Sequence, residues 1–440
     1  MNRAKLADLI AWKNSPDRKP LIIRGARQTG KTWLMKEFGR QEYARTVYLN
    51  LEKNRHLSSL FSDDFDIKRV IIALQAETGL TVSHDDTLII FDEIQAVPEV
   101  ITALKYFRED APGYHVIAAG SLLGMVMHAG ISFPVGKVAF LDLYPLTFTE
   151  FLEAAGDGSL NALLNSGDWK LIDAFKTRYI ERLRQYYYVG GMPEAVAKFI
   201  ENNDFSEVRK IHRQILEMYE SDFSKHAPNE IVPRIRMLWN SIPSQLAKEN
   251  RKFIYSLVRE GSRAKDYELA LSWMTDCGQV HKVTRVTKPA IPLKAYEEQK
   301  AFKLFMVDTG LLAAMGDVDQ KTLLEGNTLF AEFKGALTEQ YVFQQLISND
   351  YVNVHYWSAD RATAEIDFVV QYEGIVAPVE VKAEENLRAK SLKVFHEKFS
   401  PAVSVRISMS GFRRQNWLIN LPLYAVSELG SVLKKAAGGK

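Results

Sequence analysis

Short apolar runs alternate with helix-like stretches through the first third of the chain. Predominantly apolar runs at 21–23, 46–51, 87–91 and 114–119 predict strands, and apolar residues recur every three or four positions between them, as in 67–77. Apolar strands that alternate with helices indicate a parallel sheet covered by helices on both faces. Residues 1–150 are therefore predicted to form an α/β domain.

The pattern changes three times beyond residue 150. A mostly helical stretch comes first. Short predicted helices and two β-rich stretches, at 280–286 and 302–307, come next, and their order is typical of a winged helix-turn-helix. A long predicted helix then leads into strands at 352–357, 365–370 and 376–381. We therefore predict four parts, which are residues 1–150, 151–228, 229–328 and 329–440.

Composition sets limits on this picture. The 440 residues are 47% hydrophobic and 25% charged, which is ordinary for a globular protein, and the net charge is +2. The single cysteine, Cys277, excludes internal disulfides and multi-cysteine zinc sites, and it fits a reducing compartment. No apolar run reaches the ~18 residues of a membrane span, and residues 1–13 do not resemble a signal peptide. We expect a cytoplasmic protein without a membrane partner.

The segment 25–32 carries the clearest chemistry, because it lies between a predicted strand and a predicted helix. Its glycines let successive N–H groups point at one centre, and the helix N-terminus adds the positive end of its dipole. Lys31 can reach the β- and γ-phosphates, and the Thr32 hydroxyl can ligate Mg²⁺. We therefore predict an ATP phosphate-binding loop made of Gly25, Ala26, Arg27, Gln28, Thr29, Gly30, Lys31 and Thr32.

Two carboxylates, Asp92 and Glu93, directly follow the predicted strand at 87–91. Four apolar residues followed by two acids form a Walker B pattern. Strand geometry places Asp92 beside the phosphate loop, where it can bind Mg²⁺, and Glu93 can polarise the attacking water. These residues predict ATP hydrolysis with Lys31 and Glu93 as catalytic residues.

Several segments resemble a prokaryotic family of AAA-type ATPases, usually fused to a C-terminal domain of unknown function. The resemblance covers essentially the whole chain. It implies that Ser121 senses the γ-phosphate, a plain turn at the strand end being the alternative. The family commonly has an arginine where Lys137 stands, and lysine lacks its bidentate fork, so Arg108 and Arg40 are alternative arginine fingers. The segments that carry the resemblance are 25–32, 88–95, 120–121, 132–138, 143–148 and 190–194.

Acidic residues gather on two neighbouring predicted strands near the C-terminus. Because strand side chains alternate with a period of two, Asp367, Glu380 and Lys382 can converge, and Glu339 on the preceding helix can join them. This order resembles the PD-(D/E)xK nuclease superfamily. The resemblance implies a restriction-endonuclease-like α/β domain with Lys382 as a catalytic residue. It also implies a second Mg²⁺ or Mn²⁺, with Glu339, Asp367 and Glu380 as ligands. The alternatives are a degenerate fold used only for binding, and a Glu380–Lys382 salt bridge on a solvated face.

Basic residues surround the predicted winged helix. A helix-turn-helix would present such residues to DNA, whereas a solvated face is the bland alternative. The residues are Arg251, Lys252, Arg263 and Lys265 around the helix at 263–276, and Lys282, Arg285, Lys288 and Lys294 in the wing.

Together these features predict an Mg²⁺-dependent, AAA-type ATPase whose nucleotide state controls how the winged-helix and nuclease-like domains engage DNA. One alternative is a nucleotide-gated binding switch with no nuclease activity. Another is a scaffold whose rear domain binds a protein. A homo-oligomer is a further expectation, because AAA-type ATPases often need a neighbour's arginine.

Overall fold

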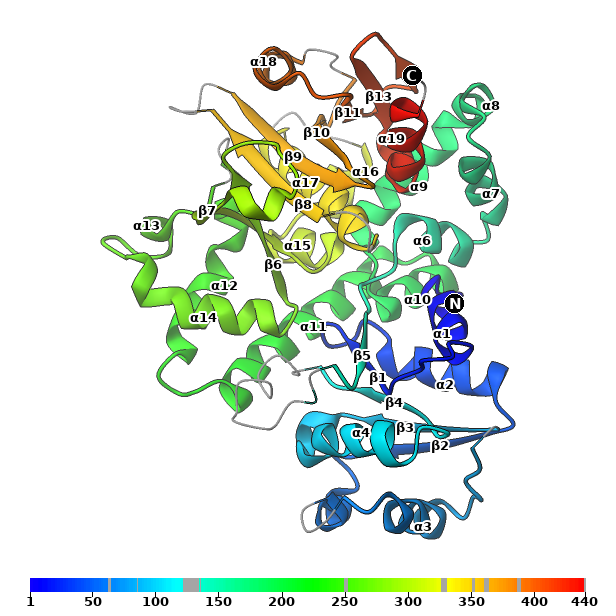
Figure 1. The fold of residues 1–440 in the computed structure, drawn as a ribbon. Helices are drawn as coiled ribbons and strands as arrows, with labels where there is room; N and C mark the ends of the chain where they lie inside the picture. Colours follow the sequence, from blue (N-terminus) through cyan, green and yellow to red (C-terminus); the bar gives the residue numbers. More distant parts are fainter. Residues whose placement is uncertain are drawn as a thin grey trace. The chain divides into compact units, whose positions relative to one another are not determined.

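The protein is described here by a computed structural model, which divides into two compact units (Figure 1). The N-terminal unit comprises Asn2–Tyr144 and Ser272–Gln279, and the C-terminal unit comprises Met1, Pro145–Leu271 and Val280–Lys440. The structure describes residues 1–61, 65–84, 86–121, 134, 136–248, 252–325, 331–349, 353–359, 364–385 and 389–438.

The N-terminal unit is built on a sheet in which all strand pairs are parallel, in the order β2-β3-β4-β1-β5. This confirms the predicted α/β class and the predicted strands of this region. The strands are β1 (Leu21–Arg24), β2 (Arg45–Asn50), β3 (Thr87–Asp92), β4 (His115–Ala119) and β5 (Ala139–Asp142). The helical segments are α1 (Lys5–Lys13), α2 (Lys31–Glu42), η1 (Arg55–Phe61), α3 (Ile67–Thr78), η2 (Ile94–Ala96) and α4 (Glu99–Asp110).

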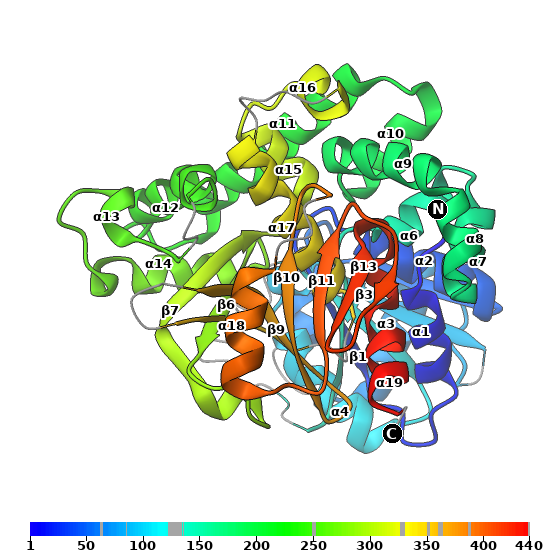
Figure 2. The same ribbon diagram turned by 90° about the horizontal axis from the view of Figure 1, so that it is seen from above.

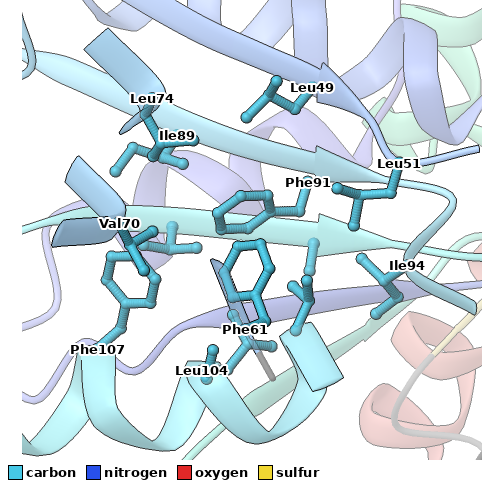
Figure 3. Close-up of a cluster of buried hydrophobic side chains, with 14 of the residues drawn as sticks. Leu49, Leu51, Phe61, Val70, Leu74, Ile89, Phe91, Ile94, Leu104 and Phe107 are labelled. Atoms are coloured by element: carbon cyan, nitrogen blue, oxygen red, sulfur yellow. The ribbon is translucent and has the colours of Figure 1, made fainter. Parts of the chain in front are cut away.

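Strand β3 is buried along its whole length because it contributes side chains to two cores. Ile89 and Phe91 point into one apolar cluster, where Phe91 meets Phe61 and Phe107 (Figure 3). Leu88 and Ile90 join a second cluster on the opposite face. Because both faces are buried, the central residues 88–91 are all apolar, and the acids Asp92 and Glu93 come only where the strand ends.

Helices dominate the first half of the C-terminal unit. The Gly-Gly-Met-Pro segment at 190–193 lies between two of them, and its role there is structural. Gly191 N donates to Asp308 Oδ2 at 2.6 Å, and a Cβ on Gly191 would lie 2.1 Å from Leu146 O. Burial raises the pKa of Asp308, and the hydrogen bonds that its carboxylate accepts, including the one from Gly191, oppose this rise. The helices are α6 (Phe148–Ala154), α7 (Gly158–Ser166), α8 (Trp169–Ala174), α9 (Lys176–Val189), α10 (Pro193–Asn202), α11 (Phe205–His226), α12 (Val232–Leu246), α13 (Tyr255–Val258) and α14 (Ala264–Asp276), of which α14 ends in the N-terminal unit.

The second half of this unit forms a mixed sheet in the order β12-β13-β11-β10-β9-β8-β6-β7. Its members are β6 (Val280–Val286), β7 (Glu297–Met306), β8 (Asn353–Ser358), β9 (Glu365–Tyr372), β10 (Ile375–Val381), β11 (Ser404–Ser408), β12 (Arg413–Arg414) and β13 (Leu418–Pro422).

The pair β6–β7, predicted as the wing, is antiparallel and belongs to this same sheet. Strand β6 pairs with β8 at Arg285–Tyr356, so the sheet runs across the boundary predicted near residue 329. Helix α18 (Lys390–Phe399) packs on the sheet through Leu392 and Phe395 (Figure 2). The remaining helical segments are η3 (Leu293–Tyr296), α15 (Thr309–Met315), α16 (Gln320–Glu325), α17 (Ala331–Ile347), η6 (Leu423–Glu428) and α19 (Leu429–Ala437).

Among the described helices, none combines the length and the apolar character that a bilayer crossing requires.

Candidate functional site

The predicted phosphate loop connects the end of β1 at Arg24 to the start of α2 at Lys31. Gly30 caps the helix in the left-handed region, with φ of 92°. Gly25 has φ of 153°, and a Cβ there would lie only 2.2 Å from Leu143 O. Both positions therefore require glycine, and the loop curls against the start of a helix as an anion-binding loop does.

Lys31 is buried within this loop, where its Nζ donates to the carbonyl oxygens of Gly25 and Ala26 at 2.8 Å each. Burial lowers its pKa to about 8, although the charges of Glu93 and Asp92 oppose the change. The ammonium is thus held among loop atoms, where it can meet a phosphate.

Asp92, only 2% exposed, is the meeting point of three elements at the end of β3. Its Oδ2 accepts from Thr32 Oγ1 of α2 at 2.7 Å and from the Tyr48 hydroxyl of β2 at 2.9 Å. The structure therefore brings together Thr32 and Asp92, the two predicted Mg²⁺ ligands. Oxygen ligands of this kind suit Mg²⁺.

Tyr48 is a site residue that the sequence did not reveal. Burial, reinforced by the charge of Asp92, raises the pKa of Tyr48 to about 12, so its hydroxyl stays a donor. Lys36 Nζ lies 3.7 Å from the centre of the Tyr48 ring. Strands β2 and β3 pair in parallel with Asn50 opposite Asp92. Tyr48 stands two residues before Asn50, and this position was the signal in the sequence that could have identified it as a site residue.

Glu93 has an unusual backbone, with φ of 55° in the left-handed region. A non-glycine residue there costs about 1 kcal/mol or more, and such strain clusters at functional sites. Its Oε2 accepts from Gln95 Nε2 at 2.5 Å, and its N–H donates to Asp92 Oδ1 at 3.1 Å. Gln95 belongs to the resembling segment 88–95, where the sequence indicated no role for it, and its hydrogen bond fixes the direction of the predicted catalytic carboxylate.

Strand β4 lies between β1 and β3, so its end lies between the phosphate loop and the acidic pair. Ala119 pairs with Ile23 on one side and with Asp92 on the other. Ser121 follows two residues later and is buried. Its place in the topology fits a γ-phosphate contact, which stays a prediction.

The candidate arginine fingers are each engaged by a neighbouring carboxylate. Lys137 Nζ lies 2.8 Å from Glu109 Oε1 and lowers the pKa of Glu109. Arg108 pairs with Asp17, and Arg40 lies 2.6 Å from Glu37. Of the resembling run at 132–138, residues 132, 133 and 135 lie outside the described residues.

In the C-terminal unit two of the predicted acids, Glu339 and Asp367, lie around a lysine together with Glu365, which was not among the predicted site residues. Lys303 Nζ lies 2.5 Å from Glu365 Oε1, 3.7 Å from Glu339 Oε2 and 3.9 Å from Asp367 Oδ1. Within the described part of the chain, no group of three or more His, Cys, Asp or Glu residues could hold a metal ion. The predicted second metal, with Glu339, Asp367 and Glu380 as ligands, therefore has no support from this geometry.

Glu380 and Lys382 form the ion pair that was the alternative prediction, with 2.9 Å between Oε1 and Nζ. The face is not solvated at Glu380, however, because this residue is buried and burial raises its pKa, against the effect of Lys382. Asp367 Oδ2 accepts from Val381 N at 2.7 Å.

The basic residues predicted to contact DNA are only partly available. Arg285 donates to Glu298 Oε2 at 2.8 Å and to Ser358 O at 2.7 Å, so it stabilises the sheet. Lys282 lies over the Phe302 ring and is exposed. Arg251 lies outside the described residues, whereas Lys252, Arg263, Lys265 and Lys294 are exposed and Lys288 is exposed over the Tyr296 ring.

Comparison with protein families assigns three parts of the chain. Residues 17–152 match the family described as AAA domain. Residues 180–322 and 334–424 match two families described as domains of unknown function, DUF8612 and DUF4143. A comparison with curated proteins found no significant match.

Solved structures give weak overall likeness. The Walker-type ATPase PABY2304 of Pyrococcus abyssi is 13% identical, with a TM-score of 0.45 over 72% of this chain and 95% of that one. Orc1 of Aeropyrum pernix in complex with DNA is 12% identical, with a TM-score of 0.28 over 72% and 93%. Cdc6p of Pyrobaculum aerophilum is 13% identical, with a TM-score of 0.24 over 73% and 92%. Scores this low carry no argument about function.

The family match and the site geometry agree on the N-terminal unit. A glycine-built loop, a buried lysine and an aspartate joined to the loop threonine stand within residues 17–152. This part of the chain is an AAA-type P-loop ATPase domain, and it binds ATP. The resemblance to a nuclease in the C-terminal unit has no such support.

Proposed function

We propose that the N-terminal unit hydrolyses ATP with Mg²⁺ and that its nucleotide state controls what the C-terminal unit binds. One observation carries the first half of this proposal. The Thr32 hydroxyl and Asp92 carboxylate are in direct contact, with Glu93 next along the chain. The two groups that would share Mg²⁺ and the carboxylate that would act on water therefore come from adjacent elements.

Each residue then has a distinct task. Lys31 leaves the loop carbonyls to neutralise the β- and γ-phosphates. Thr32 and Asp92 would hold Mg²⁺, which supplies charge neutralisation on the phosphates when bound. Glu93 accepts a proton from the attacking water or orients it. Ser121, at the end of the strand between them, contacts the γ-phosphate.

Tyr48 and Gln95 are positioning residues in this proposal. Tyr48 fixes one Asp92 oxygen by a hydrogen bond, and Gln95 does the same for Glu93. Holding charged groups in place before the substrate arrives reduces the reorganisation that the reaction requires.

An arginine from another copy of the chain would complete the site. Lys137, Arg108 and Arg40 each face a carboxylate of their own chain, so one of these pairs would have to open before its cation could reach the site of a neighbouring copy. Arg40 is the most exposed of the three, with 70% of its side chain accessible.

For the C-terminal unit we propose DNA binding through its exposed basic residues, including Lys252, Arg263 and Lys265. A second candidate function is cleavage of DNA with Lys382 as a catalytic residue, and it has less support than DNA binding alone. The observation that favours binding or scaffolding without cleavage is Lys303, which lies among the carboxylates.

The experiment measures binding of the full chain to duplex DNA with ADP, with a non-hydrolysable ATP analogue and without nucleotide. We expect the affinity to differ between nucleotide states and to lose that difference in Lys31→Ala. Lys53→Ala, which removes an exposed lysine, is the matched control. Equal affinity in all states would refute nucleotide control, and absence of DNA binding would favour a protein partner.

A further inference from the structure

Lys303 of β7 is one of the most deeply buried charged residues in the described part of the chain, with 0% of its side chain exposed. Burying an ammonium is expensive unless opposite charges surround it. Here Glu339 comes from α17, and Glu365 and Asp367 come from β9. The Tyr356 ring, with its centre 5.2 Å from Nζ, closes another side.

Two of these carboxylates, Glu339 and Asp367, are among the three predicted metal ligands. Mg²⁺ requires oxygen atoms at about 2.0–2.1 Å in near-octahedral order. Lys303 Nζ instead lies within 3.9 Å of three carboxylates, so its positive charge fills the space between them. Backbone and side-chain donors engage neighbouring oxygens, since Val381 N binds Asp367 Oδ2 and Lys382 binds Glu380 Oε1.

We propose that Lys303 takes the place of the divalent cation in this cluster, so that the C-terminal unit needs no metal for folding or binding. Two acids of the nuclease-like order, Glu339 and Asp367, then serve to hold a lysine from β7, a strand outside the motif. The ammonium joins β7 to α17 and β9, which links the β6–β7 pair to the rest of the sheet.

The test measures Mn²⁺ uptake by the full chain without nucleotide, from the electron paramagnetic resonance signal of free Mn²⁺. Every protein carries Asp92→Asn, so that the ATPase site contributes nothing and the result does not depend on the proposed ATPase activity. We expect no uptake with Lys303 present. In Lys303→Met the uncompensated carboxylates should take up one ion per chain, an uptake that the protein with Lys303 lacks.

Lys300→Met, an exposed change on the same strand, is the control and should behave like the Lys303 protein. Adding Glu339→Gln to Lys303→Met should abolish the gained uptake. A folded Lys303→Met that takes up no Mn²⁺ would overturn the proposal. If that variant does not fold, the Asp92→Asn protein that retains Lys303 decides the test. Mn²⁺ uptake by this protein that Glu339→Gln removes would overturn the proposal, whereas the absence of Mn²⁺ uptake would support it.

Discussion

Thr32 Oγ1 donates a 2.7 Å hydrogen bond to Asp92 Oδ2, which joins the first turn of α2 to the end of β3. The two residues are 60 positions apart in the chain. Parallel packing of β2, β3, β4 and β1 brings their ends to one edge of the sheet, where ligands of open α/β sheets bind. The contact gives the predictions for the ATPase site their geometric basis.

Replacing Glu93 by Gln should separate binding from hydrolysis. The amide keeps the shape of the side chain but cannot accept a proton, so turnover should fall about 10²- to 10³-fold. ATP affinity, measured with a fluorescent analogue, should stay unchanged. Glu99→Gln, an exposed change in the same unit, should leave both values intact. Normal turnover in the Glu93 variant would show that another group activates water.

ATP affinity should weaken as the pH rises through about 8, because burial lowers the pKa of Lys31 to about that value. Below it the side chain is charged and attracts phosphate, and above it binding must take up a proton. The affinity should then fall by about tenfold per pH unit, until other groups titrate. Calorimetry at several pH values measures the slope.

Lys31→Arg provides the control for this pH dependence, because a guanidinium stays charged throughout the range. Its affinity should be weaker and nearly independent of pH. A wild-type affinity that is constant between about pH 7 and 9.5 would contradict the assigned role of Lys31.

Tyr48→Phe should weaken the response to Mg²⁺ without removing activity. The change deletes one hydrogen bond to Asp92 and keeps the ring beneath Lys36, a loss of about 1 kcal/mol. The Mg²⁺ concentration for half-maximal hydrolysis should rise several-fold at saturating ATP. Tyr106→Phe, in a ring stacked on Phe65, should leave it unchanged. An equal rise in both variants would indicate a general loss of packing.

Gly191→Ala should destabilise the C-terminal unit by about 3 kcal/mol, because the new methyl group would strike Leu146 O. Urea unfolding, followed by a probe in this unit, measures the change. Gly156→Ala has open space but positive φ, so it should cost only about 1 kcal/mol. Similar values for the two variants would show that backbone strain, not close contact, explains the Gly-Gly segment.

Local patterns predicted the parts of the fold that local residues determine. The strands of the N-terminal unit follow from apolar runs, and the phosphate loop follows from glycines at 25 and 30. The acid pair at the end of β3 follows from the same run, since the strand is buried on both faces. These features need no knowledge of distant contacts.

Other features depend on contacts between distant segments, which no single segment reveals. Tyr48 reaches Asp92 only because β2 lies beside β3. The β6–β7 pair joins the C-terminal sheet where Arg285 pairs with Tyr356. These two residues lie far apart in the chain, so the local pattern of the pair resembled an independent wing. Lys303 has no motif of its own, and its meaning comes entirely from the acids around it.

The rate of Mg²⁺-dependent ATP hydrolysis by the purified full chain tests the central claim most directly. Steady-state release of phosphate is measured for wild type, Lys31→Ala and the surface control Lys53→Ala. We predict turnover in wild type and in the control, and turnover reduced to background in Lys31→Ala. Hydrolysis that survives in Lys31→Ala would contradict the claim that the loop at 25–32 is the catalytic ATP site.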